Sequence, residues 1–423
     1  MTQPAACGII IPSEVIMSLF IHLDMNNFYA SVECQLNPSL RDKPVAVAGS
    51  PEKRHGVVLA KNEIAKKFGV KTGDTVLEAE AKAPGIVFVP PHFDIYDKIS
   101  KKMFGICNRY TCFVEPFGPD ECWLDCTETV HLFGSGEDIA NGLRASIKEE
   151  LELTASAGVS FTKMFAKLGS DIKKPDATTV ITRENYKEKV WGLAVGDLCG
   201  VGNKTAEKLK KLNILTIGDL ARADERVLKK LLGKPGVDLR RIARGEEEGQ
   251  VREAVCSRDV KSVSHGLTAL RDLVTREDGV TLIGYLSELV AARLKKYSFK
   301  ASGIYLGIRY SDLTRYGKQL ALPSPICSSS DISDSAIALF DEIWNGQPLR
   351  SIDVGTFALS SAAQPVQLSM FDGTSKTESR EKLDEIIAGL RMRYGKNAVI
   401  RASQMNEDIY TDKDVGDFLP FKR

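Results

Sequence analysis

The apolar run 19–23 ends on a carboxylate, Asp24, and this junction constrains the fold more than any other short segment. The composition of the run is typical of a buried strand. The residues after Asp24 repeat apolar side chains at helical spacing, at Phe28, Val32 and Leu36. The sequence therefore predicts that Asp24 lies where a buried strand gives way to a helix.

Two further carboxylates, Asp120 and Glu121, are adjacent in the segment 117–125, where a predicted hairpin turns. One acid at a strand end and two in a distant hairpin can hold two Mg²⁺ ions for in-line phosphoryl transfer. Nucleotide polymerisation needs that arrangement. Taken singly, Asp120 and Glu121 are more often solvated turn acids, and a lone carboxylate after a strand is a weak signal.

The chain has 423 residues, more than the roughly 250–300 that one core supports, so three or four compact units are expected. Its net charge of +1 averages over uneven segments. Residues 201–245 carry 12 Lys/Arg against 5 Asp/Glu, and residues 251–320 carry 12 against 7. These excesses suit a polyanionic partner, although a solvated helix face explains either one equally well.

The 9 cysteines show no CxxC pair and no metal-site spacing with histidine, which predicts reduced thiols in the cytoplasm. No apolar run approaches the roughly 20 residues that span a bilayer, so no membrane association is expected. Residues 1–17 are expected to be an N-terminal extension, with Met17 a candidate natural start.

The pattern along the chain changes twice. Strands and helices alternate up to about residue 180, which predicts an α+β sheet layered with helices. From Trp191 short helices are separated by glycines, which fits a small helical domain. A second α/β unit follows, with strands at 261–267, 303–310 and 353–359 and helices at 277–297 and 331–345; a further helix is predicted near 380–394.

Segments 24–33 (DMNNFYASVE) and 118–125 (GPDECWLD) resemble the two catalytic motifs of Y-family translesion DNA polymerases. Segments 62–73, 157–175 and 199–212 also resemble family segments, in the family's order. The resemblance covers roughly residues 18–365. It implies an error-prone DNA-directed DNA polymerase, a nucleotidyltransferase that adds dNMP from a dNTP to the 3′-hydroxyl of primer-template DNA during DNA damage tolerance and the SOS response.

The implied architecture is a multidomain α+β right hand, expected to be a monomer. The palm would comprise 18–35 and 94–180, the small fingers 36–93, the helix-hairpin-helix thumb 181–248, the α/β little finger 253–362 and a C-terminal tail 363–423. Small fingers close loosely on the nascent base pair, which implies low fidelity. An inactive scaffold tethered to the sliding clamp is the alternative, but such relatives typically lose the acids that are present here.

The resemblance also assigns the metal ligands. The acids matching Asp24 and Asp120 ligate two Mg²⁺ ions, which Mn²⁺ can replace. The acid matching Glu121 holds the catalytic ion, and the carbonyl at Met25 helps hold the nucleotide-bound ion. Such ions activate the primer hydroxyl and offset the charge of the triphosphate.

Four residues match or adjoin the family's nucleotide site. Tyr29 matches the steric gate, an aromatic ring that collides with a ribose 2′-hydroxyl; alone, such an aromatic is usually core packing. Asn27 and Phe28 are expected to offer backbone N–H groups to the phosphates at a helix start. Lys174 matches the lysine that contacts the terminal phosphates.

The chain departs from the family in the fingers and the hairpin. Many members carry a Tyr and an Arg on the triphosphate where this chain has Glu63 and Lys66. Lys66 can still supply a charge, whereas Glu63 would repel phosphate if it pointed inward. Pro119 is expected to bend the hairpin differently. Lys163 and Lys167 are expected to be solvated and are given no role.

Two segments resemble DNA-binding elements. Gly200 and Gly202 resemble the turn of a helix-hairpin-helix, which binds phosphate through backbone N–H groups, and Lys204 strengthens that reading over an ordinary turn. Lys261 and Ser262 begin a segment that resembles the family's DNA-gripping strand. His265 is as readily structural as DNA-contacting.

The segment 367–371 (QLSMF) resembles the peptide by which bacterial polymerases bind the sliding clamp. Gln367, Leu368, Met370 and Phe371 would be its anchors. Tethering of this kind raises the effective concentration of a polymerase at the primer end.

Overall fold

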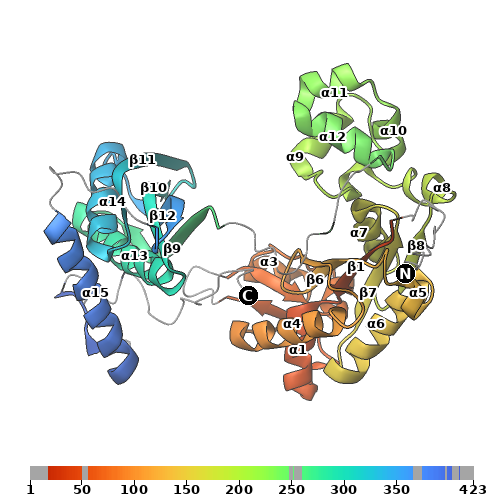
Figure 1. Cartoon of the computed structure of the whole chain (residues 1–423), viewed down its shortest axis with the longest axis horizontal. Helices are drawn as coiled ribbons and strands as arrows, with labels where there is room; N and C mark the ends of the chain where they lie inside the picture. The colour runs from red at the N-terminus through yellow and green to blue at the C-terminus, as the bar shows by residue number, and fades with distance from the viewer. Residues whose placement is uncertain are drawn as a thin grey trace, which may run out of the picture. The chain divides into compact units, whose positions relative to one another are not determined.

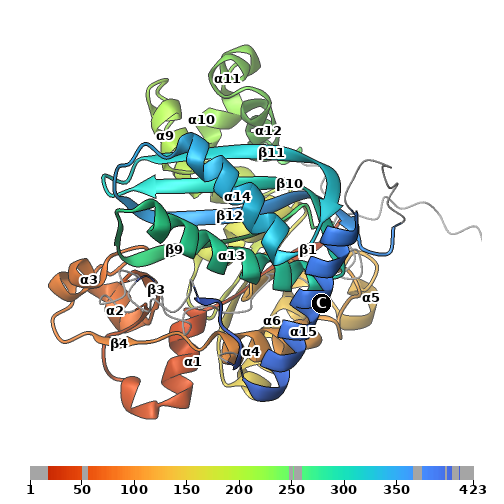
Figure 2. The same cartoon turned by 90° about the vertical axis from the view of Figure 1, so that its left-hand side faces the viewer.

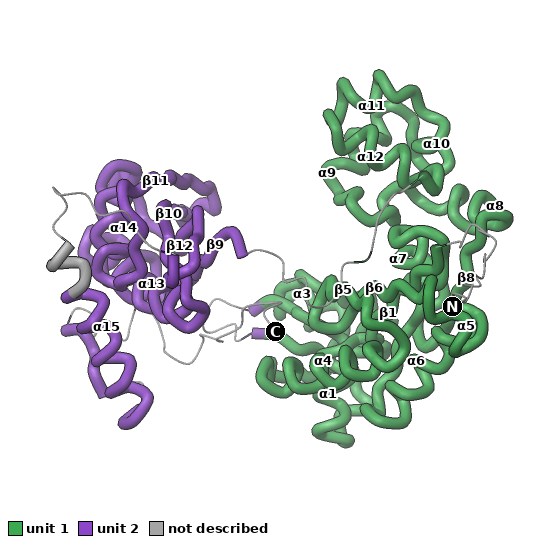
Figure 3. The backbone as a smooth tube through the Cα atoms, viewed as in Figure 1, with its two compact units in different colours: residues 1–48, 57–257, 418–423 green, residues 49–56, 258–417 purple. Residues whose placement is uncertain are grey.

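The computed structural model describes residues 18–49, 56–246, 251, 260–364, 374–395, 398–402 and 409. Its chain forms two compact units, coloured in Figure 3. Of the described residues, 18–48, 57–246 and 251 belong to unit 1 and the others to unit 2. The predicted extension 1–17 and the peptide 367–371 lie outside the described residues.

Unit 1 is built on a five-stranded sheet of order β5-β6-β1-β7-β8, antiparallel except for the pair β7 and β8. The strands are β1 (Phe20–Met25), β5 (Val114–Pro116), β6 (Glu121–Asp125), β7 (Ala155–Ser160) and β8 (Thr178–Ile181). The predicted strand before Asp24 is thus the central strand, and both its neighbours come from much later in the chain. Its burial on both faces explains its nearly continuous apolar sequence.

Side chains alternate between the two faces of this sheet, and different helices cover each face (Figure 1). Ile21 and Leu23 face a core formed with α4 (Phe93–Cys107) and α6 (Gly136–Leu151). Phe20 faces the other way, where α7 (Lys163–Ile172) contributes Ala166. Asp24 shares the α7 face because it is four residues from Phe20. Helix α1 (Phe28–Leu36) begins just beyond the end of β1.

Helix α7 lies very close to the sheet because Gly158 has no side chain. A Cβ at Gly158 would lie 1.9 Å from the carbonyl oxygen of Ala166. On its other side α7 contributes Phe165 and Leu168 to the core of the helical segment that follows. Both faces of α7 are therefore covered.

Two smaller groups complete unit 1. A three-stranded sheet of order β3-β2-β4 joins β2 (Val45–Ala48), β3 (Val58–Lys61) and β4 (Val87–Val89), with η1 (Pro38–Leu40), α2 (Glu63–Lys67) and α3 (Val76–Lys82). The short helix α5 (Val130–Phe133) precedes α6. The helical segment comprises α8 (Tyr186–Val190), η3 (Val195–Asp197), α9 (Asn203–Lys210), α10 (Ile217–Arg222), α11 (Glu225–Leu232) and α12 (Lys234–Ala243).

Unit 2 is an antiparallel sheet of order β11-β10-β12-β9, packed on one side by two helices (Figure 2). Its elements are β9 (Ser262–Leu273), α13 (Arg276–Lys296), β10 (Phe299–Tyr310), β11 (Arg315–Ile326), α14 (Ser329–Ile343) and β12 (Leu349–Ser361). Strand β11 has no counterpart among the predicted strands, because it is a mostly exposed edge strand without a buried apolar pattern.

The helix predicted near 380–394 is longer in the structure, where α15 spans Thr374–Tyr394. It is held to unit 2 by polar contacts. Lys300 Nζ lies 2.9 Å from Glu381 Oε1, and the backbone N–H of Ser329 donates to Asp384 Oδ2 at 2.7 Å. The described part of the C-terminal region therefore belongs structurally to unit 2.

Candidate active site

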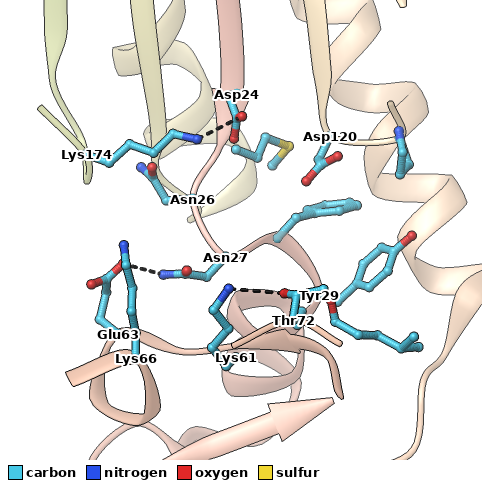
Figure 4. Close-up of a pocket in the computed structure, with 15 residues that line it drawn as sticks. Asp24, Asn26, Asn27, Tyr29, Lys61, Glu63, Lys66, Thr72, Asp120 and Lys174 are labelled. Carbon is cyan, nitrogen blue, oxygen red and sulfur yellow. Dashed lines mark hydrogen bonds and ion pairs between the residues drawn. The ribbon is translucent and has the colours of Figure 1, made fainter. Parts of the chain in front are cut away.

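A pocket of about 440 Å³ opens in unit 1 where the end of β1 meets the start of α1 (Figure 4). Strand β3, helix α2, the turn before β6 and the segment after α7 form its other walls. Its lining includes eight of the residues that sequence analysis selected: Asp24, Met25, Asn27, Phe28, Tyr29, Lys66, Asp120 and Lys174. It also includes Asn26, Leu59, Ala60, Lys61, Glu63, Thr72 and Pro119.

Asp24 is bound by Lys174 in the pocket. Lys174 Nζ donates to Asp24 Oδ2 at 2.9 Å and also contacts Asp171 Oδ1 at 2.6 Å. Burial raises the pKa of Asp24, although Lys174 opposes the rise. Burial alone would lower the pKa of Lys174, but the carboxylates of Asp24 and Asp171 outweigh burial and raise that pKa. Lys174 therefore stays charged, beside the carboxylate predicted to bind metal.

Asp120 is held in the pocket by the turn that precedes β6. Its carbonyl accepts the backbone N–H of Met25 at 3.0 Å, which ties this turn to the end of β1. Burial raises the pKa of Asp120 to about 7, and the nearby carboxylates of Asp24 and Glu121 add to the rise. Negative charge is therefore crowded at this point, with too little positive charge to balance it.

Glu121 is directly opposite Asp24 in the register of β1 and β6, so both side chains emerge on the α7 face. The carboxylate of Glu121, however, does not line the pocket. It is paired with Lys167 of α7, and His22 Nε2 lies 3.3 Å from its Oε2. Burial alone would raise the pKa of Glu121, but its contacts with His22 and Lys167 lower it to about 2.

The prediction that Lys163 and Lys167 are solvated was wrong. Lys163 Nζ is buried and pairs with Glu115 Oε2 at 2.7 Å, and Lys167 pairs with Glu121. Helical spacing gave the apolar face of α7 correctly, but that face packs on the helical segment and the lysine face packs on the sheet. The prediction failed because it assumed that the polar face of a helix meets water, whereas α7 is covered on both sides.

His22 is a site residue that sequence reasoning missed. It is fully buried in β1, and its Nδ1 lies 2.9 Å from Ser170 Oγ on α7. Burial lowers the pKa of His22 despite the nearby carboxylates. The available signal was a histidine inside an otherwise apolar run, two residues before Asp24.

The donor set fits hard divalent cations, although it is not preassembled. Among the described residues, no three His, Cys, Asp or Glu side chains already form a cluster ready to hold a metal ion. Asp24 and Asp120 nevertheless present carboxylate oxygens to one pocket, and Glu121 is opposite Asp24 in register. Oxygen ligands of this kind suit Mg²⁺, and a cation would counter the burial and the carboxylate repulsion that raise the pKa of Asp120.

Tyr29 is fixed by other aromatic rings. It stacks on Tyr96 with ring centroids 4.2 Å apart and meets the edge of Phe93 at 6.0 Å. Tyr96 is itself anchored, because its hydroxyl donates to the buried carboxylate of Glu33, which His92 Nδ1 also approaches at 2.9 Å. The ring of Tyr29 is thus held at the pocket wall by a packed layer.

Glu63, which would repel phosphate if it pointed inward, does line the pocket. Its carboxylate accepts a hydrogen bond from Asn27 Nδ2 at 2.8 Å and lies 3.4 Å from Lys66 Nζ. Asn27 has a left-handed backbone, with φ of 51°, a conformation that asparagine tolerates better than most residues. Glu63 therefore ties α2 to the start of α1 and partly neutralises Lys66.

The candidate DNA-binding residues lie on both units. In unit 1, Gly200 has a φ of 93° and Gly202 precedes α9, on which Lys204 is exposed. In unit 2, Lys261 and Ser262 are exposed at the start of the edge strand β9. Burial and Arg293 lower the pKa of His265 to about 4, which favours a neutral, structural histidine there.

Comparisons with known proteins cover nearly the whole chain. Residues 23–171 match the impB/mucB/samB family, residues 260–370 match the C-terminal domain of that family, and residues 196–247 match a domain described as the thumb of DNA polymerase-iota. DNA polymerase IV of Acetivibrio thermocellus is 45% identical over 384 residues, covering 90% of this chain and 96% of that protein. DNA polymerase IV of Bacillus velezensis is 35% identical over 408 residues, covering 93% and 98%.

Among solved structures, a Y-family DNA polymerase chimera matches with a TM-score of 0.73 at 24% identity, covering 80% of this chain and 98% of that one. This likeness concerns the fold. Within the part of the chain that the structure describes, no helix has the length and apolar character that a membrane crossing requires.

The raised pKa of Asp120 predicts a specific pH dependence of stability. Its pKa of about 7 exceeds the ordinary value of about 3.9, so between these pH values the unfolded chain binds fewer protons than the folded one. Without divalent metal, the free energy of unfolding should therefore fall as pH rises through this window. Between pH 5 and pH 8, the free energy of unfolding should fall by roughly 2 kcal/mol less in Asp120→Asn than in the parent.

Thermal melts in EDTA at the two pH values measure this effect. Asp97→Asn is the control, because Asp97 on α4 is partly exposed and pairs only with Lys101 among the described residues. An equal change in melting temperature at both pH values for Asp120→Asn would contradict the assignment.

Proposed function

The chain belongs to the Y family of DNA polymerases, the impB/mucB/samB family, and acts as a translesion DNA polymerase; we propose that the pocket of unit 1 is its catalytic centre. The observation that carries this proposal is the pairing of β1 with β6. It sets Glu121 opposite Asp24, and Asp24 lines a pocket together with Asp120, Tyr29 and Lys174. No observation favours the inactive scaffold.

We propose that Asp24, Asp120 and Glu121, with the carbonyl of Met25, hold two Mg²⁺ ions, for which Mn²⁺ can substitute. Bound there, the ions would lower the pKa of the primer hydroxyl and offset the charge of the triphosphate. Lys167 keeps Glu121 charged, and Asp24 keeps Lys174 charged and directed into the pocket. The chain thus supplies ionised groups of both signs before substrate arrives.

The remaining pocket residues would position the nucleotide. Lys174 and Lys66 would contact its phosphates, together with the backbone N–H groups of Asn27 and Phe28. The ring of Tyr29, backed by Tyr96, would lie under the sugar and exclude ribose by collision. A rigid ring is required, because a mobile one could move aside for a 2′-hydroxyl.

We further propose the right-hand division of the chain. The five-stranded sheet would be the palm, residues 36–93 the fingers, 181–248 the thumb and 253–362 the little finger. Gly200, Gly202 and Lys204 of the thumb, and Lys261 and Ser262 of the little finger, would contact DNA phosphates without reading bases. The protein would act in the cytoplasm as a monomer, bound to the sliding clamp through residues 367–371.

Glu121→Gln tests the catalytic assignment with an isosteric, uncharged side chain. Because it weakens metal binding and leaves the shape of the site, primer extension with Mg²⁺ should fall at least about 100-fold on both undamaged and abasic templates. Glu128→Gln, at an exposed position beyond β6, is the control and should extend primers like the parent. Parental activity in Glu121→Gln would remove Glu121 from the catalytic centre.

Tyr29→Ala tests the exclusion of ribonucleotides. Removal of the ring should raise ribonucleotide incorporation relative to deoxynucleotide incorporation by roughly 10-fold or more, measured as the ratio of kcat/KM values. Tyr29→Phe keeps the ring and should keep the selectivity of the parent. If Tyr29→Ala discriminates as well as the parent does, the gate lies elsewhere.

Deletion of residues 367–371 tests the clamp peptide. Loss of the tether should lower synthesis in the presence of a loaded bacterial clamp, because the effective concentration at the primer end falls. Synthesis without the clamp is the control and should not change. Equal clamp stimulation before and after the deletion would disprove the role of this segment.

A further inference from the structure

The pocket is lined by six charged side chains, three of each sign: Asp24, Glu63, Asp120, Lys61, Lys66 and Lys174. Two of the lysines are already paired with acids. Lys174 contacts Asp24 and Asp171, and Lys66 lies 3.4 Å from Glu63. For Lys61, the described residues provide no carboxylate within ion-pair distance.

Lys61 reaches the pocket because of its place at the end of β3. It pairs in register with Ala46 of the neighbouring strand β2. Its ammonium donates to Thr72 Oγ1 at 3.1 Å, and Figure 4 shows it turned toward Asn27 at the start of α1. A neutral hydroxyl thus orients the ammonium without cancelling its charge.

The three lysines are close enough to affect one another. Burial lowers the pKa of Lys61, and both Lys66 and Lys174 lower it further, although Glu63 and Asp74 act in the opposite direction. Positive groups brought together at a pocket wall destabilise one another until an anion binds among them. Lys61 therefore gains most from a bound anion, because Lys66 and Lys174 already have acids beside them.

We propose that Lys61 binds the triphosphate of the incoming nucleotide, an inference that rests on the proposed function of the same pocket. Glu63 reduces the attraction of Lys66 for a nucleotide, because its carboxylate forms an ion pair with Lys66 and is held by a hydrogen bond from Asn27. Lys61 has no carboxylate partner among the described residues and presents its ammonium from strand β3, a different wall from that of Lys174. The polyphosphate is therefore bound from β3 as well as from the segment after α7.

Equilibrium nucleotide binding without chemistry tests this role. A dideoxy-terminated primer-template with Ca²⁺ forms the ternary complex but cannot react, and fluorescence of a 2-aminopurine in the template reports dNTP binding. Lys61→Met should weaken dNTP binding roughly 10-fold, since it removes one charge-assisted contact. Lys61→Arg should restore binding to within about twofold of the parent, because it keeps the charge.

Lys67→Met is the matched control. Lys67 lies on α2, is exposed and does not line the pocket, so its loss changes the net charge of the same region equally. It should leave dNTP affinity unchanged. Parental dNTP affinity in Lys61→Met would overturn the proposal, and so would an equal loss in Lys67→Met.

Two further measurements separate the alternatives. The affinity of Lys61→Met for primer-template should match the parent; a loss there with intact dNTP affinity would make Lys61 a DNA contact and contradict the proposal. Binding of inorganic tripolyphosphate to the protein alone should also be weaker in Lys61→Met, and unchanged binding would count against the proposal. Tripolyphosphate binding does not depend on polymerase activity, so failure of the proposed function would appear separately, as a parent that extends no primer.

Discussion

The antiparallel pairing of β1 with β6 is the constraint on which the rest of the site depends. It joins residues about a hundred positions apart and places Asp24 opposite Glu121 on one face of a sheet. The backbone N–H of Met25 donates to the carbonyl of Asp120 and fixes the turn beside them. Crowding of three carboxylates is unfavourable without counter-charge, so the fold brings cations to the same face.

Helix α7 supplies most of that counter-charge. It reaches the sheet closely because Gly158 has no Cβ, and it presents Lys167 to Glu121. Lys174 follows the helix and reaches Asp24. These lysines neutralise the two carboxylates that they contact in a partly buried site. In the proposed catalytic complex each lysine would give up its carboxylate for another partner. The protein without ligands thus holds paired charges where the complex would hold ions and a triphosphate.

Sequence reasoning succeeded where local pattern and chemistry coincide. The strand before Asp24, the hairpin acids and the α+β polymerase fold were predicted, and the fold is confirmed by the match to a Y-family polymerase structure. Eight selected residues meet in one pocket, although their individual roles stay predictions. The failures have physical causes. Lys167 looked solvated because periodicity cannot show that a helix is covered on both faces, and β11 lacked a buried pattern because it is a solvated edge.

The proposed catalytic centre requires Asp24, Asp120 and Glu121 to share two divalent ions beside a bound triphosphate. Anomalous diffraction from crystals of the protein with Mn²⁺, primer-template DNA and a nonhydrolysable dNTP analogue tests it most directly. Two manganese peaks are expected between these carboxylates, with the carboxylate of Glu121 turned from Lys167 toward one of them. Peaks elsewhere, with Glu121 still paired only with Lys167, would contradict it.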